Sequence, residues 1–283
     1  MNIVVCVKQV PDTNEVKIDP VTNNLVRIGV PSIINPADEN AIEEALKCRE
    51  KCGGTVTIVS MGPLQAEEVL QHGLDMGADR AILLSDRLFA GSDTLATGYA
   101  LSALIKSLNP DIVFCGFEAI DGCTGQVGPA IAENLGFPQI TYVNEIIDIN
   151  NKEINLSREI NDAYELLNSR LPALICVRKG INTPRLPKPG TKKPEQKSAG
   201  DLGLDHTRIG INGSPTRVVK IDLSGRRASS FVVIDSKLSA DERIMSMING
   251  GMAHKKITLT KGTAFHLAEL ISKDEIFSRR MGN

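Results

Sequence analysis

The first part of the chain, up to about residue 140, alternates short apolar runs with stretches in which apolar residues recur at helical spacing. The runs are rich in Val and Ile, and they are Ile3–Val7, Val56–Ser60, Ala81–Leu84 and Ile112–Cys115. Strands that are covered on both faces have this continuous apolar pattern, and sheets of such strands are mostly parallel. The runs therefore predict the buried strands of a parallel sheet.

Helices are predicted between these strands, and the clearest of them begins at Asn35-Pro36. Asn is a favoured N-cap, Pro suits the first helical position, and Asp38 and Glu39 complement the helix dipole in the first turn. The other predicted helices are Gln65–Met76, Thr94–Leu108 and Gln126–Leu135. Strands and helices that alternate in this way predict a doubly wound, mostly parallel α/β sheet of the flavodoxin or Rossmann kind.

After Tyr142 the pattern changes to strands separated by polar turns. These predicted strands are Val143–Ile149, Glu153–Ser157, Ala163–Asn168 and Ala173–Val177. A polar turn at 150–152 joins the first two, which predicts a hairpin extension of the sheet and then a last buried strand. We expect a single α/β domain over residues 1–180.

Residues 181–205 contain four prolines, three glycines and five basic side chains, with little periodicity. A stretch of this length without regular structure is expected where it serves a function or contacts a partner. Beyond it, short strands are predicted at 216–221 and 231–234, and modest helices at 240–248 and 264–271. Residues 206–283 have too little apolar content for a second large core, so they predict a C-terminal arm.

Composition narrows the class of protein. Hydrophobic residues make up 42% of the chain, and 32 basic and 34 acidic residues give a net charge of -2, so we expect a globular protein that does not bind nucleic acid. No apolar window is long enough for membrane insertion, and the N-terminus lacks the features of a signal peptide. The six cysteines are scattered and predict free thiols in a cytoplasmic, reducing environment, without the spacing of a metal site.

Candidate ligand-binding residues follow the predicted strands, because ligands of open α/β sheets bind beyond the carboxyl ends of the strands. Four segments have this position: Cys6–Pro11, Ser60–Pro63, Gly91–Thr94 and Gly116–Gly128. The last contains four glycines and a threonine just before a helix, where free amides and the helix dipole suit a pyrophosphate. It lacks the usual glycine fingerprint of dinucleotide-binding proteins.

Simpler explanations stay open for several of these residues. Asn35-Pro36 and Gly91–Thr94 fit plain helix caps, and Glu118 and Asp121 fit turn-forming roles. The basic residues of 178–197 fit either a solvated loop or a docking site for an acidic partner.

Taken in order, the motifs resemble those of the β subunit of an electron transfer flavoprotein. They are Cys6–Asp12, Asn35-Pro36, Ser60–Pro63, Ser92–Thr94, Ala119–Gly122, Leu171–Ala173, Asn182–Arg185 and Gly213–Thr216. The resemblance covers nearly the whole chain. It implies an adenine-nucleotide-binding domain, a heterodimer with an α subunit, a partner-recognition loop at 181–205 and an arm, from about residue 190 onward, that wraps the α subunit.

The family binds nucleotide in its β subunit in two ways. Housekeeping members hold a structural AMP, whereas bifurcating members hold a second FAD that accepts hydride from NADH. Here the stretch Asp121–Pro129 is similar to the bifurcating pattern Asp-Gly-Asp-Thr-x-Gln-Val-Gly-Pro. Gly122 and Gly125 leave space beside a diphosphate, and the small Val127 and Gly128 suit a bulkier nucleotide, so the residues favour FAD over AMP.

Two departures from the family pattern are present. Cys123 stands where relatives often have Asp, and the segment after Pro184-Arg185 lacks their denser lysine run.

The resemblance also implies the nucleotide contacts, with Thr94 and Thr124 as partners of a phosphate or a ribitol hydroxyl. The full set is Cys6, Asn35, Met61, Asp93, Thr94, Asp121, Thr124, Gln126, Val127 and Gly128. It names no catalytic acid or base and no metal ligand, because the flavin carries the redox chemistry. The implied role is a subunit of an NAD- and ferredoxin-linked oxidoreductase complex that splits or merges electrons with an acyl-CoA-type or other flavin dehydrogenase.

Three alternative functions are compatible with parts of this pattern. The nearest is a housekeeping β subunit with AMP and no NADH oxidation. A stress-type nucleotide-binding regulatory module would have a similar sheet but about half the length, and no C-terminal arm. An adenylating enzyme would carry Ser-Gly-Gly-x-Asp-Ser after the first strand, where this chain has Lys-Gln-Val-Pro-Asp-Thr.

Overall fold

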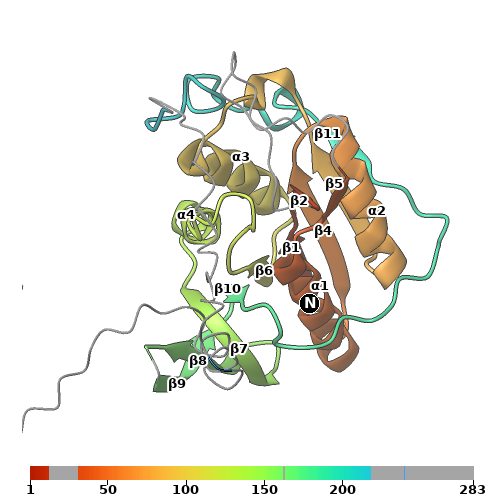
Figure 1. The fold of residues 1–283 in the computed structure, drawn as a ribbon, viewed down its shortest axis with the longest axis vertical. Coiled ribbons are helices and arrows are strands. Elements are labelled where there is room, and N and C mark those ends of the chain that lie inside the picture. Colours follow the sequence, from red (N-terminus) through yellow and green to blue (C-terminus); the bar gives the residue numbers. More distant parts are fainter. Residues whose placement is uncertain (13–30, 162, 218–238, 240–283) are drawn as a thin grey trace, which may run out of the picture. The chain divides into compact units, whose positions relative to one another are not determined.

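The computed structural model describes residues 1–12, 31–161, 163–217 and 239. The described residues form a nine-stranded sheet with β1 (Asn2–Cys6) between β4 (Thr55–Met61) and β6 (Ile112–Gly116) (Figure 1). Continuing past β4 come β5 (Arg80–Leu84) and β11 (Glu195–Lys197), and past β6 come β10 (Ala173–Val177), β7 (Gln139–Ile149), β8 (Glu153–Ile160) and β9 (Ala163–Arg170). A separate antiparallel pair joins β2 (Gln9–Pro11) to β3 (Ser32–Ile34).

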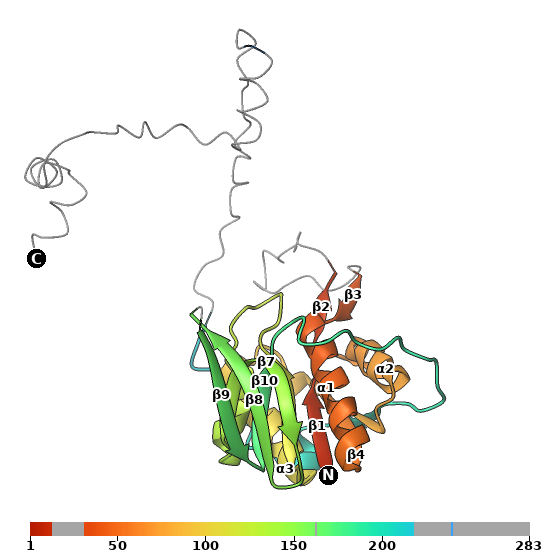
Figure 2. The ribbon, with the colours of Figure 1, turned by 90° about the horizontal axis from the view of Figure 1, so that it is seen from below.

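The strands from β11 to β7 pair in parallel, and β7, β8 and β9 pair antiparallel. Figure 2 shows these three antiparallel strands side by side. The hairpin extension predicted from the sequence is therefore confirmed, although β7 begins at Gln139, earlier than predicted.

Helices cover both faces of the sheet, as the doubly wound prediction requires. Helices α1 (Pro36–Cys52) and α2 (Glu67–Met76) pack on one face, while α3 (Thr94–Ser107) and α4 (Val127–Leu135) pack on the other. Side chains alternate along each strand, so Ile3 and Val5 face α1 whereas Val4 and Cys6 belong to the core beside α3.

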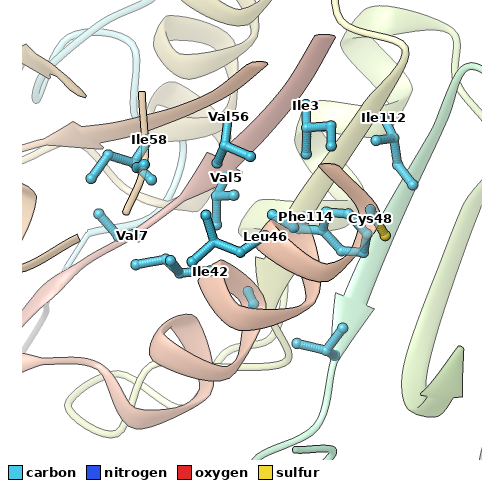
Figure 3. Packing of buried hydrophobic residues seen from close by; sticks show 14 of the residues in the cluster. Ile3, Val5, Val7, Ile42, Leu46, Cys48, Val56, Ile58, Ile112 and Phe114 are labelled. Carbon is cyan, nitrogen blue, oxygen red and sulfur yellow. The ribbon is translucent and has the colours of Figure 1, made fainter. Parts of the chain in front are cut away.

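The hydrophobic core between α1 and the sheet is formed by the apolar residues that recur at helical spacing in α1. Ile42 and Leu46 lie one turn apart on α1 and are fully buried (Figure 3). They belong to one hydrophobic cluster with Val5 of β1 and Phe114 of β6. The apolar repeat that predicts α1 is therefore the face that this helix buries against the centre of the sheet.

The segment 181–205 differs from its prediction, because residues Glu195–Lys197 form β11 on the edge of the sheet. The sequence Glu-Gln-Lys has no apolar signal, and the strand is held by backbone pairing with β5 and by the ion pair between Arg80 and Glu195. Polar side chains are common on edge strands. Pairing with β5, which lies far earlier in the chain, therefore determines that these polar residues form a strand.

Several predicted elements lie wholly or partly outside the described residues. Thr216 and Arg217 are in no strand, and the rest of the strand predicted at 216–221 lies outside the described residues. So do the strand predicted at 231–234, the helices predicted at 240–248 and 264–271, and with them most of the C-terminal arm. All described residues except Ser239 belong to one unit, Met1–Lys220.

All six cysteines lie in the described ranges, and they are free. None of the helices in the described ranges combines the length and the apolar character that a bilayer crossing would need.

Candidate functional site

The candidate site lies where the order of the parallel strands reverses. From β1 the chain moves to β4 and β5 on one side, and it then returns to β6 on the other side of β1. Ligands of such sheets bind at this reversal, beyond the carboxyl ends of the strands. Because β1, β4, β5 and β6 are parallel, all four predicted ligand-binding segments leave the same edge of the sheet.

Helix α3 begins at this edge, but a side chain of the protein already accepts hydrogen bonds from its first amides. Asp93 is the N-cap, and its Oδ1 accepts hydrogen bonds from the Leu95 and Ala96 amides at 3.0 and 3.1 Å. The other carboxylate oxygen accepts from the amide and hydroxyl of Thr216, at 3.0 and 2.7 Å. Partial burial opposes ionisation of Asp93, but these hydrogen bonds outweigh it and lower the pKa of Asp93.

Helix α4 begins beside α3, and its N-cap residue Gln126 makes no side-chain capping bond, although the Thr124 hydroxyl accepts the Gln126 amide at 3.5 Å. The Gln126 side chain points elsewhere: its Oε1 accepts a hydrogen bond from the Thr94 hydroxyl at 2.9 Å. The first amides of an α-helix have no partner within the helix, so an uncapped N-terminus can bind an anion. The start of α4 is therefore a better anion site than the start of α3.

Close packing of the two helices brings Thr94 and Gln126 together. A Cβ atom on Gly98 of α3 would lie 2.7 Å from the Cβ of Ala130 on α4, which is closer than real contacts allow. The absence of a side chain at Gly98 thus permits the helices to approach, and two of the predicted nucleotide contacts meet as a result.

The glycines of the loop before α4 have different structural reasons. Gly122 faces open space, since a Cβ atom there would meet nothing within 4 Å. Gly125 has a φ of +61°, a conformation that glycine adopts without strain. A Cβ on Gly128 would lie 2.6 Å from Cys176 Sγ, so Gly128 is required where α4 packs on β10. That Gly128 also leaves room for a bulky nucleotide stays a prediction.

Asn35 forms hydrogen bonds with the loop that precedes α4. The residue is 1% exposed, so it is buried and does not lie at the surface. Its Nδ2 donates to the Glu118 carbonyl at 2.9 Å, and its Oδ1 accepts from the Ile120 amide at 3.2 Å. Asn35 precedes α1 but does not cap it with its side chain. The structure therefore gives Asn35 a role in shaping the loop, and a direct nucleotide contact stays a prediction.

Asp121 is paired with Lys8, a residue that the sequence analysis did not single out. Lys8 Nζ lies 2.6 Å from Asp121 Oδ1, and only 3% of the Asp121 side chain is exposed. The pairing neutralises a carboxylate that would otherwise repel phosphate. Lys8 lies within the predicted ligand-binding segment Cys6–Pro11 after β1. This position is the feature of the sequence that could have indicated a role for Lys8 in the site.

Cys6 and Met61 end strands β1 and β4 and pack into the hydrophobic core beside α3. In the register of the sheet Cys6 is opposite Cys115, which is opposite Cys176. The hydrogen bond to the Cys115 thiol and burial both raise the pKa of Cys176 well above its ordinary value, so this thiol stays neutral. Direct nucleotide contacts of Cys6 and Met61 stay predictions, as do those of Thr124 and Val127.

A parallel sheet that reverses at β1, with a glycine-rich loop and the start of a helix at that edge, is the architecture of the doubly wound α/β proteins, many of which bind nucleotides at this edge. Residues 22–201 match the family model described as electron transfer flavoprotein domain. The chain is 48% identical over 256 residues to the electron transfer flavoprotein subunit beta of Thermoanaerobacterium thermosaccharolyticum, covering 88% of this chain and 98% of that one.

Other relatives agree. Identity is 46% over 262 residues to the same subunit of Clostridium acetobutylicum, covering 86% of this chain and all of that one. It is 43% over 249 residues to Protein FixA of Azorhizobium caulinodans, covering 83% and 89%. The chain belongs to the electron transfer flavoprotein family, among its β subunits. Membership implies electron transfer, an α-subunit partner and a flavin or AMP as bound nucleotide.

Proposed function

We propose that this β subunit binds FAD at the start of α4 and belongs to a cytoplasmic, NAD- and ferredoxin-linked oxidoreductase complex. The observation that carries the proposal is the uncapped N-terminus of α4, placed at the strand reversal and bordered by Thr94 and Gln126. Residues 1–180 would bind the nucleotide, 181–205 would recognise a partner, and 206–283 would wrap the α subunit.

Charge and space around the loop support FAD over AMP. A diphosphate carries more negative charge than a monophosphate, and here the Asp121 carboxylate is paired with Lys8 while Asp93 is bonded to α3 and Thr216. The ion pair with Lys8 offsets the charge of Asp121, whereas Asp93 keeps its charge and directs it to the amides of α3 and to Thr216. The open space at Gly122 leaves room for the larger nucleotide.

FAD, when bound, would supply hydride exchange with NAD(H) and the one-electron steps to ferredoxin and to the α-subunit flavin. The chain's own residues would bind and orient it. The α4 amides and the Thr94 and Thr124 hydroxyls would hold phosphate or ribitol, and the loop would exclude water from them. From the α-subunit flavin, electrons would pass to an acyl-CoA-type or other flavin dehydrogenase.

The segment after residue 181 has the properties of a docking surface for that dehydrogenase. Arg185 is clamped on α1 by Glu43 and Glu50, at 2.9 and 2.7 Å. The Gly190 amide donates to the Asp75 carboxylate of α2 at 3.1 Å. Between these attachments Leu186 is 85% exposed. Because the backbone of this segment is already anchored, ordering it against a partner costs little conformational entropy, and the exposed Leu186 side chain offers apolar surface to bury.

The test is to purify the chain with its α subunit and count the nucleotides that denaturation releases. Two FAD and no AMP per heterodimer are expected, and NADH-driven reduction of ferredoxin with a dehydrogenase acceptor should follow. One FAD and one AMP would assign the chain to the housekeeping type and would refute the NADH and ferredoxin steps.

A further inference from the structure

The carboxylate of Asp38, in the first turn of α1, is bonded by three separate segments. Its Oδ2 accepts the Lys8 amide at 2.8 Å, and its Oδ1 accepts the Gly116 amide at 3.1 Å and Asn35 Nδ2 at 2.9 Å. Only 6% of the residue is exposed. One buried side chain thus connects the segment after β1, the end of β6 and the start of α1.

These bonds continue into the loop before α4. Asn35, which Asp38 orients, bonds the Glu118 carbonyl and the Ile120 amide. Lys8, whose amide bonds Asp38, extends its side chain to Asp121. The first half of the loop is therefore tied to Asp38 either directly or through one intermediate residue.

The fit around Asp38 is close. A Cβ atom on Gly116 would overlap Asp38 Oδ1 and would lie 2.9 Å from the backbone and the Cβ of Ala37. The end of β6 is thus seated directly against the first turn of α1. A substitution at Asp38 should therefore alter the packing and the hydrogen bonding of Gly116, where the loop begins.

The surroundings of Asp38 contain little charge. Lys8 faces it from the segment after β1, and Asp121 of the loop is paired with that lysine. Cys115 of β6 and Cys176 of β10 face it as neutral thiols. Burial raises the pKa of Asp38 to about 7, against the lowering effect of its hydrogen bonds. Its three partners all donate, so they match the ionised carboxylate.

We propose that Asp38 is a positioning residue of the nucleotide loop, because it holds Gly116 directly and holds Glu118 and Ile120 through Asn35. The inference rests on the proposed nucleotide site at α4. Asp38 itself touches no nucleotide in this scheme. Its loss would loosen the loop that leads to the start of α4 and would leave the sheet in place.

The test compares Asp38→Asn with Glu39→Gln in the full chain purified with its α subunit. Both variants replace a carboxyl group in the first turn of α1 by an amide. The Glu39 carboxylate, however, contacts His72 on α2 at 2.8 Å rather than the loop. Asp38→Asn replaces one accepting carboxylate oxygen by an NH2 group that can only donate, so at least one of the three bonds is lost.

Three results are expected for Asp38→Asn and not for Glu39→Gln. Hydrogen exchange in residues 116–125 should become faster, and FAD should dissociate about tenfold faster, as for the loss of one buried hydrogen bond. In the wild type, FAD release should accelerate below pH 7 as Asp38 gains a proton, whereas the variant should show no such pH dependence. A purely structural role would lower stability without abolishing that pH profile.

Unchanged exchange in 116–125 together with a wild-type rate and pH profile of FAD release would overturn the inference. If Asp38→Asn does not fold, the variant Asn35→Ala replaces it in the test, because it keeps the Asp38 bonds to Lys8 and Gly116. Hydrogen exchange at residues 118–120 should still become faster in Asn35→Ala. Exchange at the wild-type rate there would also overturn the inference. If the wild type releases no FAD, the proposed function fails, while the exchange comparison still decides the role of Asp38.

Discussion

The buried Asp38 makes the stability of the fold depend on pH in a specific direction. Its pKa is about 7 in the folded chain, against 3.8 as the ordinary value expected after unfolding. Between these values the folded chain holds a proton that the unfolded chain has released. Stability is therefore greatest below pH 4 as far as this group is concerned, and it is lost as the pH rises through 7.

The size of the effect follows from the same two values. Each pH unit between them weakens folding by about 1.4 kcal/mol, so the free energy of unfolding should fall by roughly 2.5 kcal/mol from pH 5 to pH 8. Asparagine at this position does not titrate. Asp38→Asn should therefore lack this part of the decline, while Glu39→Gln should retain it.

Urea unfolding followed by circular dichroism, at one ionic strength and at pH 5, 6, 7 and 8, measures the effect. The informative quantity is the difference in slope between the wild type and Asp38→Asn, because other titrating groups are common to both. Equal declines in the two proteins would show that Asp38 titrates at an ordinary pKa and would refute the reasoning.

Three other predictions concern the helices and the docking segment. Gly128→Val should destabilise the chain by about 1–3 kcal/mol in urea unfolding, because its side chain would overlap Cys176; an unchanged midpoint would contradict the packing. Thr94→Val removes the hydroxyl that bonds Gln126 and should weaken FAD binding about tenfold in an ultrafiltration assay, whereas equal affinity would exclude that hydroxyl from the site. Leu186→Ser should leave the melting temperature unchanged and lower affinity for the partner dehydrogenase, measured by calorimetry; undiminished affinity would place the docking surface elsewhere.

The parallel sheet and its helices were predictable because their signals are local. The strand runs match β1, β4, β5 and β6, and the Asn-Pro start and apolar repeat of α1 match the observed helix. Each signal lies within the element that it specifies. Strand β11 was not predicted, since three polar residues become a strand only when the edge of β5 is already present.

The candidate site was predicted at the level of segments rather than of individual roles. The four segments do leave one edge of the sheet, and Thr94 meets Gln126 there. Asp93 and Asn35, in contrast, use their polar atoms on the protein itself. Their residue types fit both a ligand contact and a structural hydrogen bond, and only the partners decide between the two.

The amino-acid sequence by itself determined the doubly wound sheet, the edge where a ligand would bind and the family to which the chain belongs. These depend on periodicity and on ordered motifs, which can be read along the chain. The tertiary structure alone assigned Asp38, Lys8 and Gly128 their roles, because their partners lie 30 to 113 residues away or on another element. The energy of a buried polar group depends on the donors and acceptors that face it, and folding alone brings these together.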